Sequence, residues 1–280
     1  RCGLRRLLHR KDIGKLTAFL MREEAANTFM LGNLLYYGVE DDPRILRCGD
    51  YWGYFNGDEL IGVVAFFNNS QCMAYYTDNS VMRPICDEIM ANPVRLVLGS
   101  EQCVRPMAPL LRGVPGRMVI RRQLFMEYSR DAAPAGPLPA LEYEDAKHMV
   151  GNRAVQDFIM RCMKEGFGYS ISRGTVKRIL REKTEFEPYL LAKAGGKYVA
   201  QAHIQTRTPG FSQIGGVCTL PEERHRGYAR AVVLEMMSRI ARDGGRKACL
   251  VVNEDNAGAR RLYDSLGYRE AGRLMLIDYL

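Results

Sequence analysis

A run of twelve residues near the C-terminus combines positive charge, a glycine and the start of a helix. Residues 217–228 read VCTLPEERHRGY, and the apolar stretch before them predicts a strand that ends at a turn through Leu220-Pro221. An apolar-periodic helix is expected to start at Gly227. Free N–H groups of a first helical turn, the helix dipole and nearby arginines all attract phosphate, and a glycine lets N–H groups converge on one anion. The run therefore predicts a site for a cofactor that contains a pyrophosphate.

A second run follows after the length of one helix and one strand. Residues 247–252 (KACLVV) predict a buried strand, which leads into Asn253-Glu-Asp-Asn256. The chain then places Ala259, Leu262-Tyr263 and Leu266-Gly267-Tyr268 at regular intervals. The first run alone is too short to indicate one protein family, whereas the two runs in this order are specific to a single superfamily.

Together the two runs resemble the two signatures of the GNAT superfamily, the acetyl-CoA-dependent N-acetyltransferases. Arg224, Gly227 and Ala229 occupy the named positions of R/Q-x-x-G-x-G/A, and residues 253–268 are similar to N-x-x-N-x-x-A-x-x-L-Y-x-x-x-G-Y/F. The resemblance extends more loosely over residues 141–280. It implies acetyl-CoA as the cofactor, and it implies these cofactor-binding residues: Val217, Cys218, Thr219, Arg224, His225, Arg226, Gly227, Tyr228, Ala229, Asn256 and Tyr263.

The resemblance also implies roles at the reacting thioester. A backbone N–H near Val217–Cys218 would polarise the thioester carbonyl. Tyr263 would protonate the leaving thiolate, or else it packs the helix against the sheet. Asn256 would bind the pantetheine arm, cap the helix, or do both. A covalent role for Cys218 is disfavoured, since nothing nearby in the sequence activates its thiol.

A general base is not found where the resemblance would place it. Histone-acetylating members carry a glutamate eleven residues before the Q/R position, and the corresponding residue here is Gln213, which cannot accept the proton. Glu165, Glu187 and His203 are alternatives. Either the base is non-standard, or the acceptor amine has a low pKa.

Composition excludes several other classes of protein. The 280 residues are 47% hydrophobic and 26% charged, which suffices for two cores. The net charge of +8 is not gathered into a dense basic face, so a nucleic-acid partner is not expected. The longest apolar run, residues 60–67, is too short to span a membrane. Eight scattered cysteines without C-x-x-C pairs favour reduced thiols in a cytoplasmic protein without a metal site.

A proline-rich stretch near the midpoint divides the chain. We predict a degenerate GNAT-like domain over 1–130, a linker over 131–140 and a catalytic GNAT domain over 141–280. The second half predicts helices at 152–165, 173–182, 227–243 and 256–266, and strands at 189–193, 197–205, 211–219, 247–252 and 271–279. The fold class is α/β, with two domains that each have a mostly antiparallel sheet and a central, splayed parallel strand pair.

The first half repeats this element order. Helices are expected at 11–26, 29–38, 81–91 and 101–111, and strands at 45–55, 60–67, 71–77, 94–98 and 117–127. Where a phosphate loop should lie, the chain reads DNSVMR from Asp78 to Arg83, without a glycine and with an acidic residue that repels phosphate. We therefore expect that this domain does not bind CoA.

The expected function is N-acetyl transfer from acetyl-CoA to a primary amine of a small molecule or peptide, by direct attack in a ternary complex. The alternative is a non-catalytic CoA or acyl-CoA sensor, motivated by the missing glutamate. A nucleic-acid-binding module is a weaker third possibility, raised by the net charge alone. The protein is expected to act as a monomer or homodimer without a membrane partner, and Glu165 or Tyr169 could face the acceptor.

Overall fold

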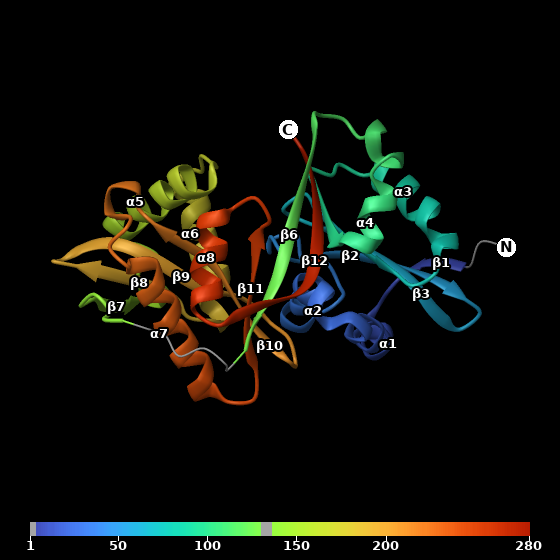
Figure 1. Ribbon diagram of the computed structural model, residues 1–280. Helices are drawn as coiled ribbons and strands as arrows, with labels where there is room; N and C mark the ends of the chain where they lie inside the picture. The colour runs from blue at the N-terminus through green and yellow to red at the C-terminus, as the bar shows by residue number, and fades with distance from the viewer. Residues whose placement is uncertain (1–3, 130–135) are drawn as a thin grey trace. The chain divides into compact units, whose positions relative to one another are not determined.

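A computed structural model describes residues 4–129 and 136–280 (Figure 1). Internal contacts divide the chain into two compact units. Unit 1 comprises residues 1–126, 252–257 and 270–280, and unit 2 comprises 127–251 and 258–269. The predicted linker falls partly outside the described residues, at 130–135. The predicted domain limits of 1–130 and 141–280 remain a prediction.

Unit 1 contains a mostly antiparallel sheet with one parallel strand pair. Its strands follow the order β1-β2-β3-β4-β5-β12-β6, and β4 runs parallel to β5 with Gln71 opposite Leu96. Helices cover this sheet from both sides (Figure 1). The elements are β1 (Leu4–Leu7), α1 (Ile13–Leu20), α2 (Glu24–Tyr37), β2 (Gly49–Asn56), β3 (Glu59–Phe67), β4 (Gln71–Tyr76), α3 (Met82–Met90), β5 (Leu96–Ser100), α4 (Glu101–Met107), β6 (Met118–Tyr128) and β12 (Tyr268–Tyr279).

Unit 2 repeats this plan. Its strands follow the order β11-β10-β9-β8-β7, in which β10 and β11 are the parallel pair. The elements are β7 (Glu142–Asp145), α5 (Arg153–Arg161), α6 (Arg173–Phe186), β8 (Tyr189–Ala194), β9 (Lys197–Arg207), β10 (Phe211–Thr219), α7 (Tyr228–Asp243), β11 (Lys247–Asn253) and α8 (Ala257–Ser265).

Local sequence explains where the elements of unit 2 begin and turn. Asn152 caps α5 by accepting hydrogen bonds from two backbone N–H groups, and Ser172 caps α6 by accepting one from the N–H of Thr175. Gly195 and Gly196 join β8 to β9 in a two-residue turn, which requires their positive φ angles of 55° and 79°. Gly244, with a φ of 73°, ends α7.

The core that supports the predicted site lies between α5, α6 and one face of the sheet. Val155, Val176 and Leu180 are fully buried there, and they pack in one cluster with Tyr189 of β8 and Cys218 of β10. Figure 1 shows α7 on the opposite face of these strands. The α5–α6 face therefore covers the strand residues to which the resemblance assigns the thioester.

The predicted α/β fold class is confirmed: the sheet is mostly antiparallel, each unit has one parallel strand pair, and helices flank the strands. In unit 2 the parallel pair lies at the end of the strand order and not at its centre. Most predicted elements lie within a few residues of the observed ones. Two short strands, β1 and β7, were missed, and the helix predicted at 152–165 changes at Cys162 into a π-helical turn that extends to Gly166.

Candidate functional site

The connection from β10 to α7 has two left-handed residues before the helix. A short 3-10 turn over Pro221–Glu223 is followed by the exposed residues 224–227. His225 has a φ of 64° and Gly227 a φ of 78°. Left-handed residues that alternate with right-handed or extended ones turn successive N–H groups toward a common point, which is the geometry of an anion-binding nest. A positive φ is uncommon for a residue other than glycine, so the conformation of His225 is a marked feature.

Gly227 occupies the cap position immediately before α7. The nearest atom to a Cβ built on this residue is Pro139 Cδ, at 3.6 Å, so a side chain would meet no steric obstacle. Glycine is therefore favoured at this position by the left-handed backbone conformation and not by a lack of space. The open approach also leaves room for an anion above the first turn of α7, where Tyr228 and Ala229 lie.

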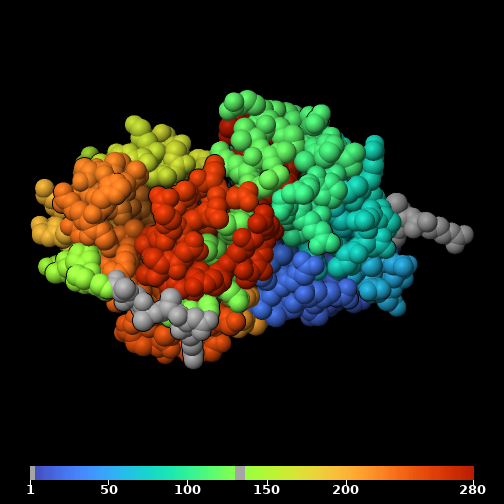
Figure 2. Space-filling model, viewed as in Figure 1, coloured from blue at the N-terminus to red at the C-terminus, as the bar shows by residue number. Residues whose placement is uncertain are grey.

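The two arginines of the loop are each held by a contact with a nearby residue. Arg224 Nε donates to the carbonyl of Thr219 at 3.4 Å, which ties the arginine to the end of β10. Arg226 pairs with Glu223 at 2.8 Å. Figure 2 shows the orange and red segments, which include α7 and α8, at the surface of the molecule. Arg224, His225, Arg226 and Gly227 are all exposed and can be reached by a soluble anion.

The parallel strands β10 and β11 pair along only part of their length. The register runs from Phe211 opposite Lys247 to Ile214 opposite Leu250. Both strands continue beyond this point, β10 to Thr219 and β11 to Asn253. Residues 217–219 thus lie beyond the pairing with β11, while Cys218 and Thr219 still pair with β9. Thr219 Oγ1 is a buried hydroxyl without a hydrogen-bond partner among the described residues. These features fit a strand end whose backbone can pair with an inserted pantetheine arm.

A bulge in β10 lies just before these residues. The register with β9 shifts between Gly215 and Cys218, and Gly216 has a φ of 60°. Gln201 Nε2 donates to the carbonyl of Gly216 at 3.0 Å, and Tyr189 Oη donates to Gln201 Oε1 at 2.9 Å. This network was not predicted from the sequence. The adjacent glycines inside a strand were the signal that could have revealed the bulge.

Cys218 contributes packing on the α5–α6 face. Its Sγ lies 2.6 Å from the position of a Cβ built on Gly166, so any side chain at Gly166 would displace it. Its S–H donates to the carbonyl of Cys162 at 3.9 Å. The hydrogen bond with Cys162 and the charge of Arg224 lower the pKa of Cys218. The thiol is nevertheless buried, and the carbonyl that it contacts cannot take its proton, so these contacts favour a structural thiol over a covalent nucleophile. The seven cysteines that the structure describes are buried and form no disulfide.

Tyr263 lies on α8 and is 7% exposed. Burial raises the pKa of Tyr263 to about 12, which keeps the phenol protonated. Its ring meets that of Tyr268 edge to face, with centroids 6.0 Å apart. Asn256 directly precedes α8, and its N–H donates to the carbonyl of Asn253 at 3.0 Å. By its contacts Asn256 belongs to unit 1, whereas Tyr263 belongs to unit 2.

The candidate bases differ in their surroundings. Arg161 forms an ion pair with Glu165 at 2.9 Å, and Arg207 forms one with Glu187 at 2.6 Å. His203 instead lies at the bulge: its Nε2 is 2.3 Å from the position of a Cβ built on Gly216, and its ring stacks on Tyr189 with centroids 4.9 Å apart. Of the three, His203 is the one that the structure brings against the bulge.

The corresponding connection in unit 1 lacks these features. Between β4 and α3 the chain forms a 3-10 turn, Asn79–Val81, which Asp78 caps by accepting the N–H of Ser80 at 2.8 Å. The Asp78 and Ser80 backbones do not adopt the left-handed conformation. The hydrogen bonds from Ser80 lower the pKa of Asp78, so the turn presents a carboxylate.

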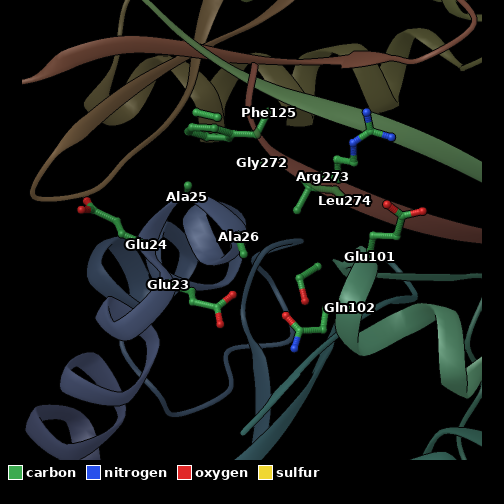
Figure 3. Close-up of a pocket in the computed structure, with 12 residues that line it drawn as sticks. Glu23, Glu24, Ala25, Ala26, Glu101, Gln102, Phe125, Gly272, Arg273 and Leu274 are labelled. Carbon is green, nitrogen blue, oxygen red and sulfur yellow. The ribbon is translucent and has the colours of Figure 1, made fainter. Parts of the chain in front are cut away.

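A cavity of about 420 Å³ lies within unit 1 (Figure 3). Glu23 and Glu24 at the start of α2 and Glu101 at the start of α4 contribute carboxylates to its lining. Phe125 and Leu274 contribute apolar surface, and Arg273 is a cation on the same rim, paired with Glu254 at 3.2 Å. None of the lining residues is a predicted cofactor residue. Three carboxylates make this cavity a poor receptor for a pyrophosphate.

Comparisons with known proteins agree with this geometry. The model of the FR47-like protein family matches residues 196–275, which include β10, the loop, α7, β11 and α8. No curated protein sequence matches the chain significantly.

Solved structures share the fold along the whole chain. A Drosophila protein superposes with a TM-score of 0.73 at 13% identity, covering 99% of both chains. A GCN5-related N-acetyltransferase from Sphaerobacter thermophilus gives 0.64 at 21% identity, covering 98% of this chain and 94% of its own. A tandem GNAT protein from the clavulanic acid biosynthesis pathway gives 0.61 at 14% identity, covering 98% and 97%.

The chain thus shares its fold with GNAT proteins over nearly its full length, and residues 196–275 match the FR47-like family model. Both findings support the resemblance predicted from the two signatures. Among residues 4–129 and 136–280, no helix is long and apolar enough to cross a membrane. The same residues contain no cluster of three or more His, Cys, Asp or Glu side chains that could hold a metal.

Proposed function

We propose that the protein is an acetyl-CoA-dependent N-acyltransferase that acts on an amine of a small molecule or peptide. The observation that supports this most is the β10–α7 connection, which leads from a strand end unpaired on its β11 side into two left-handed residues and a sixteen-residue helix. The exposed arginines of the loop supply charge for a pyrophosphate, and α7 supplies the free N–H groups of its first turn.

Acetyl-CoA supplies an acetyl thioester, and the residues of this chain orient and polarise it. The N–H of Val217 or Cys218 would donate to the thioester oxygen, where negative charge develops. The phenol of Tyr263 would donate its proton to the departing thiolate, which leaves as the thiol of CoA. The amine would attack directly and lose its proton to water, because the contacts of Cys218 favour a packed thiol over a nucleophile.

The degenerate character of unit 1 is part of the proposal. Its β4–α3 turn presents Asp78, and its cavity is lined by carboxylates, so neither suits a pyrophosphate. We propose that the β10–α7 connection of unit 2, and not the β4–α3 turn of unit 1, binds the pyrophosphate of the cofactor.

A non-catalytic CoA sensor is the second candidate, and Gln213 favours it. This side chain is 2% exposed and occupies the position where the histone-acetylating relatives carry the catalytic glutamate. A sensor would bind CoA without turnover of any amine.

A thermal melt with and without acetyl-CoA or CoA tests the cofactor site. A ligand at 100 times its dissociation constant should add about 2.7 kcal/mol to the stability of a two-state protein. Gly227→Glu should abolish the shift. The matched control is Gly244→Glu, which places the same side chain on a left-handed glycine at the other end of α7 and should keep it.

The outcomes separate the two candidates. A shift in the wild type and in the Gly244 variant, with turnover of an amine in a panel of small amines and peptides, would support the enzyme. A shift without turnover across the panel would support the sensor. No shift in a wild type that melts cooperatively would overturn the cofactor site itself.

A further inference from the structure

The bulge of β10 is held by a chain of buried hydrogen bonds that the proposed function does not yet explain. Gln201 is 1% exposed and Tyr189 is 2% exposed, so both side chains are withdrawn from solvent. Buried amides and phenols are costly unless they are satisfied, and these two satisfy each other and the carbonyl of Gly216. The network therefore fixes the orientation of one peptide group.

The direction of each hydrogen bond follows from the chemistry of the partners. The Gly216 carbonyl can only accept, so the amide nitrogen of Gln201 must face it. The amide oxygen of Gln201 then faces Tyr189, whose hydroxyl must donate. Burial raises the pKa of Tyr189, so the proton that this bond needs is retained. These hydrogen bonds can run in only one direction, with Tyr189 donating to Gln201 and Gln201 donating to Gly216.

The opposite side of the same peptide group carries the consequence. The peptide between Gly216 and Val217 is trans, so its C=O and N–H point in opposite directions. Because the C=O accepts a hydrogen bond from the side chain of Gln201, the N–H of Val217 points away from that side chain. On the side of β10 opposite β9, the neighbour β11 pairs with it only as far as Ile214. The N–H of Val217 is thus turned away from Gln201 in a part of β10 that does not pair with β11.

Gly216 makes this arrangement possible. Its φ of 60° turns the carbonyl toward Gln201, and a Cβ at this position would lie 2.3 Å from Nε2 of His203. His203 therefore packs where a side chain would otherwise be. The peptide is restrained by a hydrogen bond at its carbonyl and by an imidazole ring at its Cα.

We infer that Gln201, supported by Tyr189, is a positioning residue that aims the N–H of Val217 at the thioester oxygen of the acyl donor. The inference rests on the proposed function and adds the side chains that set the donor's direction. A fixed donor costs no reorganisation as charge develops, whereas a loose one must be ordered first.

Carbonyl infrared spectroscopy with carbonyl-labelled ¹³C acetyl-CoA tests this directly. A hydrogen bond to the thioester oxygen lowers its stretching frequency on binding. In Gln201→Glu, a carboxylate replaces the amide that donates to Gly216, so we expect most of the frequency lowering to be lost. We also expect kcat to fall about 10- to 100-fold, which is at most comparable to the effect of removing an oxyanion donor. The affinity for CoA, which has no thioester carbonyl, should stay within about 3-fold of the wild type.

Gln156→Glu is the matched control. Gln156 is also 2% exposed and donates to a backbone carbonyl, that of Val150 at 2.6 Å, but on α5 rather than β10. It should leave the carbonyl frequency and kcat unchanged. Tyr189→Phe is a milder second variant, which keeps the donor to Gly216 and should give a smaller loss of the same sign, so it serves if Gln201→Glu fails to fold.

Three outcomes would overturn the inference, and one of them would also remove the proposed function. A variant at Gln201 or Tyr189 that binds acetyl-CoA with the wild-type carbonyl frequency would overturn the positioning role and leave the proposed function standing. A wild type that binds acetyl-CoA with no lowering of the frequency would also overturn it. A wild type that does not bind acetyl-CoA would remove the proposed function and the inference together.

Discussion

The two strand-to-helix connections of this chain start from the same plan and differ in their chemistry. In unit 1 the chain leaves β4, makes a 3-10 turn capped by Asp78 and enters α3. In unit 2 it leaves β10, passes through two left-handed residues and enters α7. The first connection presents a carboxylate and the second presents arginines around a glycine. One fold thus keeps its architecture while a few residues set the charge and the backbone conformation of this connection.

The helices that follow the second strand of each parallel pair, α4 after β5 and α8 after β11, also differ in their chemistry. The seventh residue of α8 is Tyr263, a phenol with a raised pKa. The seventh residue of α4 is Met107, which is fully buried and has no proton to donate. The proposed acid and the proposed phosphate loop therefore occur together in unit 2 and are both missing from unit 1.

The largest expected effect comes from reversing the charge of the unit 2 loop. Gly227→Glu places a carboxylate where a phosphate should bind, and like charges about 4 Å apart near a protein surface repel by several kcal/mol. We expect kcat/KM for acetyl-CoA to fall at least about 100-fold, as measured by steady-state thiol release. Asn79→Glu makes a matched change in the unit 1 turn and should leave kcat/KM unchanged. Equal losses in both variants would break the comparison.

The next effect concerns the proposed acid. Tyr263→Phe removes the phenol, and loss of a general acid typically costs about 100-fold or more in rate. We expect kcat to fall by about this amount while the affinity for CoA is retained. Tyr268→Phe is the control, because Tyr268 Oη is buried without a hydrogen-bond partner among the described residues. Its loss should leave kcat unchanged and the melting temperature equal or higher.

Neutralising one arginine should have a smaller effect. Arg224→Ala removes a single exposed charge from the loop, and we expect the dissociation constant for CoA to rise about 10-fold at low salt, equivalent to about 1.4 kcal/mol. The difference from the wild type should shrink as salt is added, because the interaction is exposed. Arg83→Ala removes an exposed arginine from the start of α3 and should not change the dissociation constant. Titration calorimetry at two salt concentrations measures both.

The smallest expected effect is on the pH dependence of kcat. Because burial raises the pKa of Tyr263 to about 12, the phenol keeps its proton as pH rises to 10 and loses it only near pH 12. We therefore expect that ionisation of Tyr263 causes no fall in the kcat of the wild type between pH 8 and pH 10. A falling limb near pH 10 in the wild type that disappears in Tyr263→Phe would contradict this pKa.

Much of the fold could be predicted from the sequence because its signals are local. The hairpin at Gly195-Gly196, the glycine that ends α7 and the strand-loop-helix run at 217–228 each follow from residues close together in the chain. The strands β1 and β7 were missed because each has four residues, too few for a periodic pattern to stand out. The π-helical turn at Cys162–Gly166 has no local signal, since it depends on packing against Cys218.

The site was predictable to a smaller extent. The resemblance picked out Arg224 and Gly227, and the structure adds the left-handed backbone that makes the glycine necessary. The hydrogen bonds from Tyr189 through Gln201 to Gly216 join residues of three strands, so no spacing in the sequence could reveal them. Glycine pairs inside strands mark such bulges, but the side chains that hold them become visible only in the folded protein.

The stoichiometry of CoA binding tests the contrast between the two units most directly. Titration calorimetry of the wild type should give one CoA per chain, and Gly227→Glu should abolish binding while Asn79→Glu leaves it at one. Two CoA molecules per chain, or one whose affinity depends on Asn79 and not on Gly227, would contradict the account that the β10–α7 connection of unit 2, and not the β4–α3 turn of unit 1, binds the pyrophosphate of the cofactor.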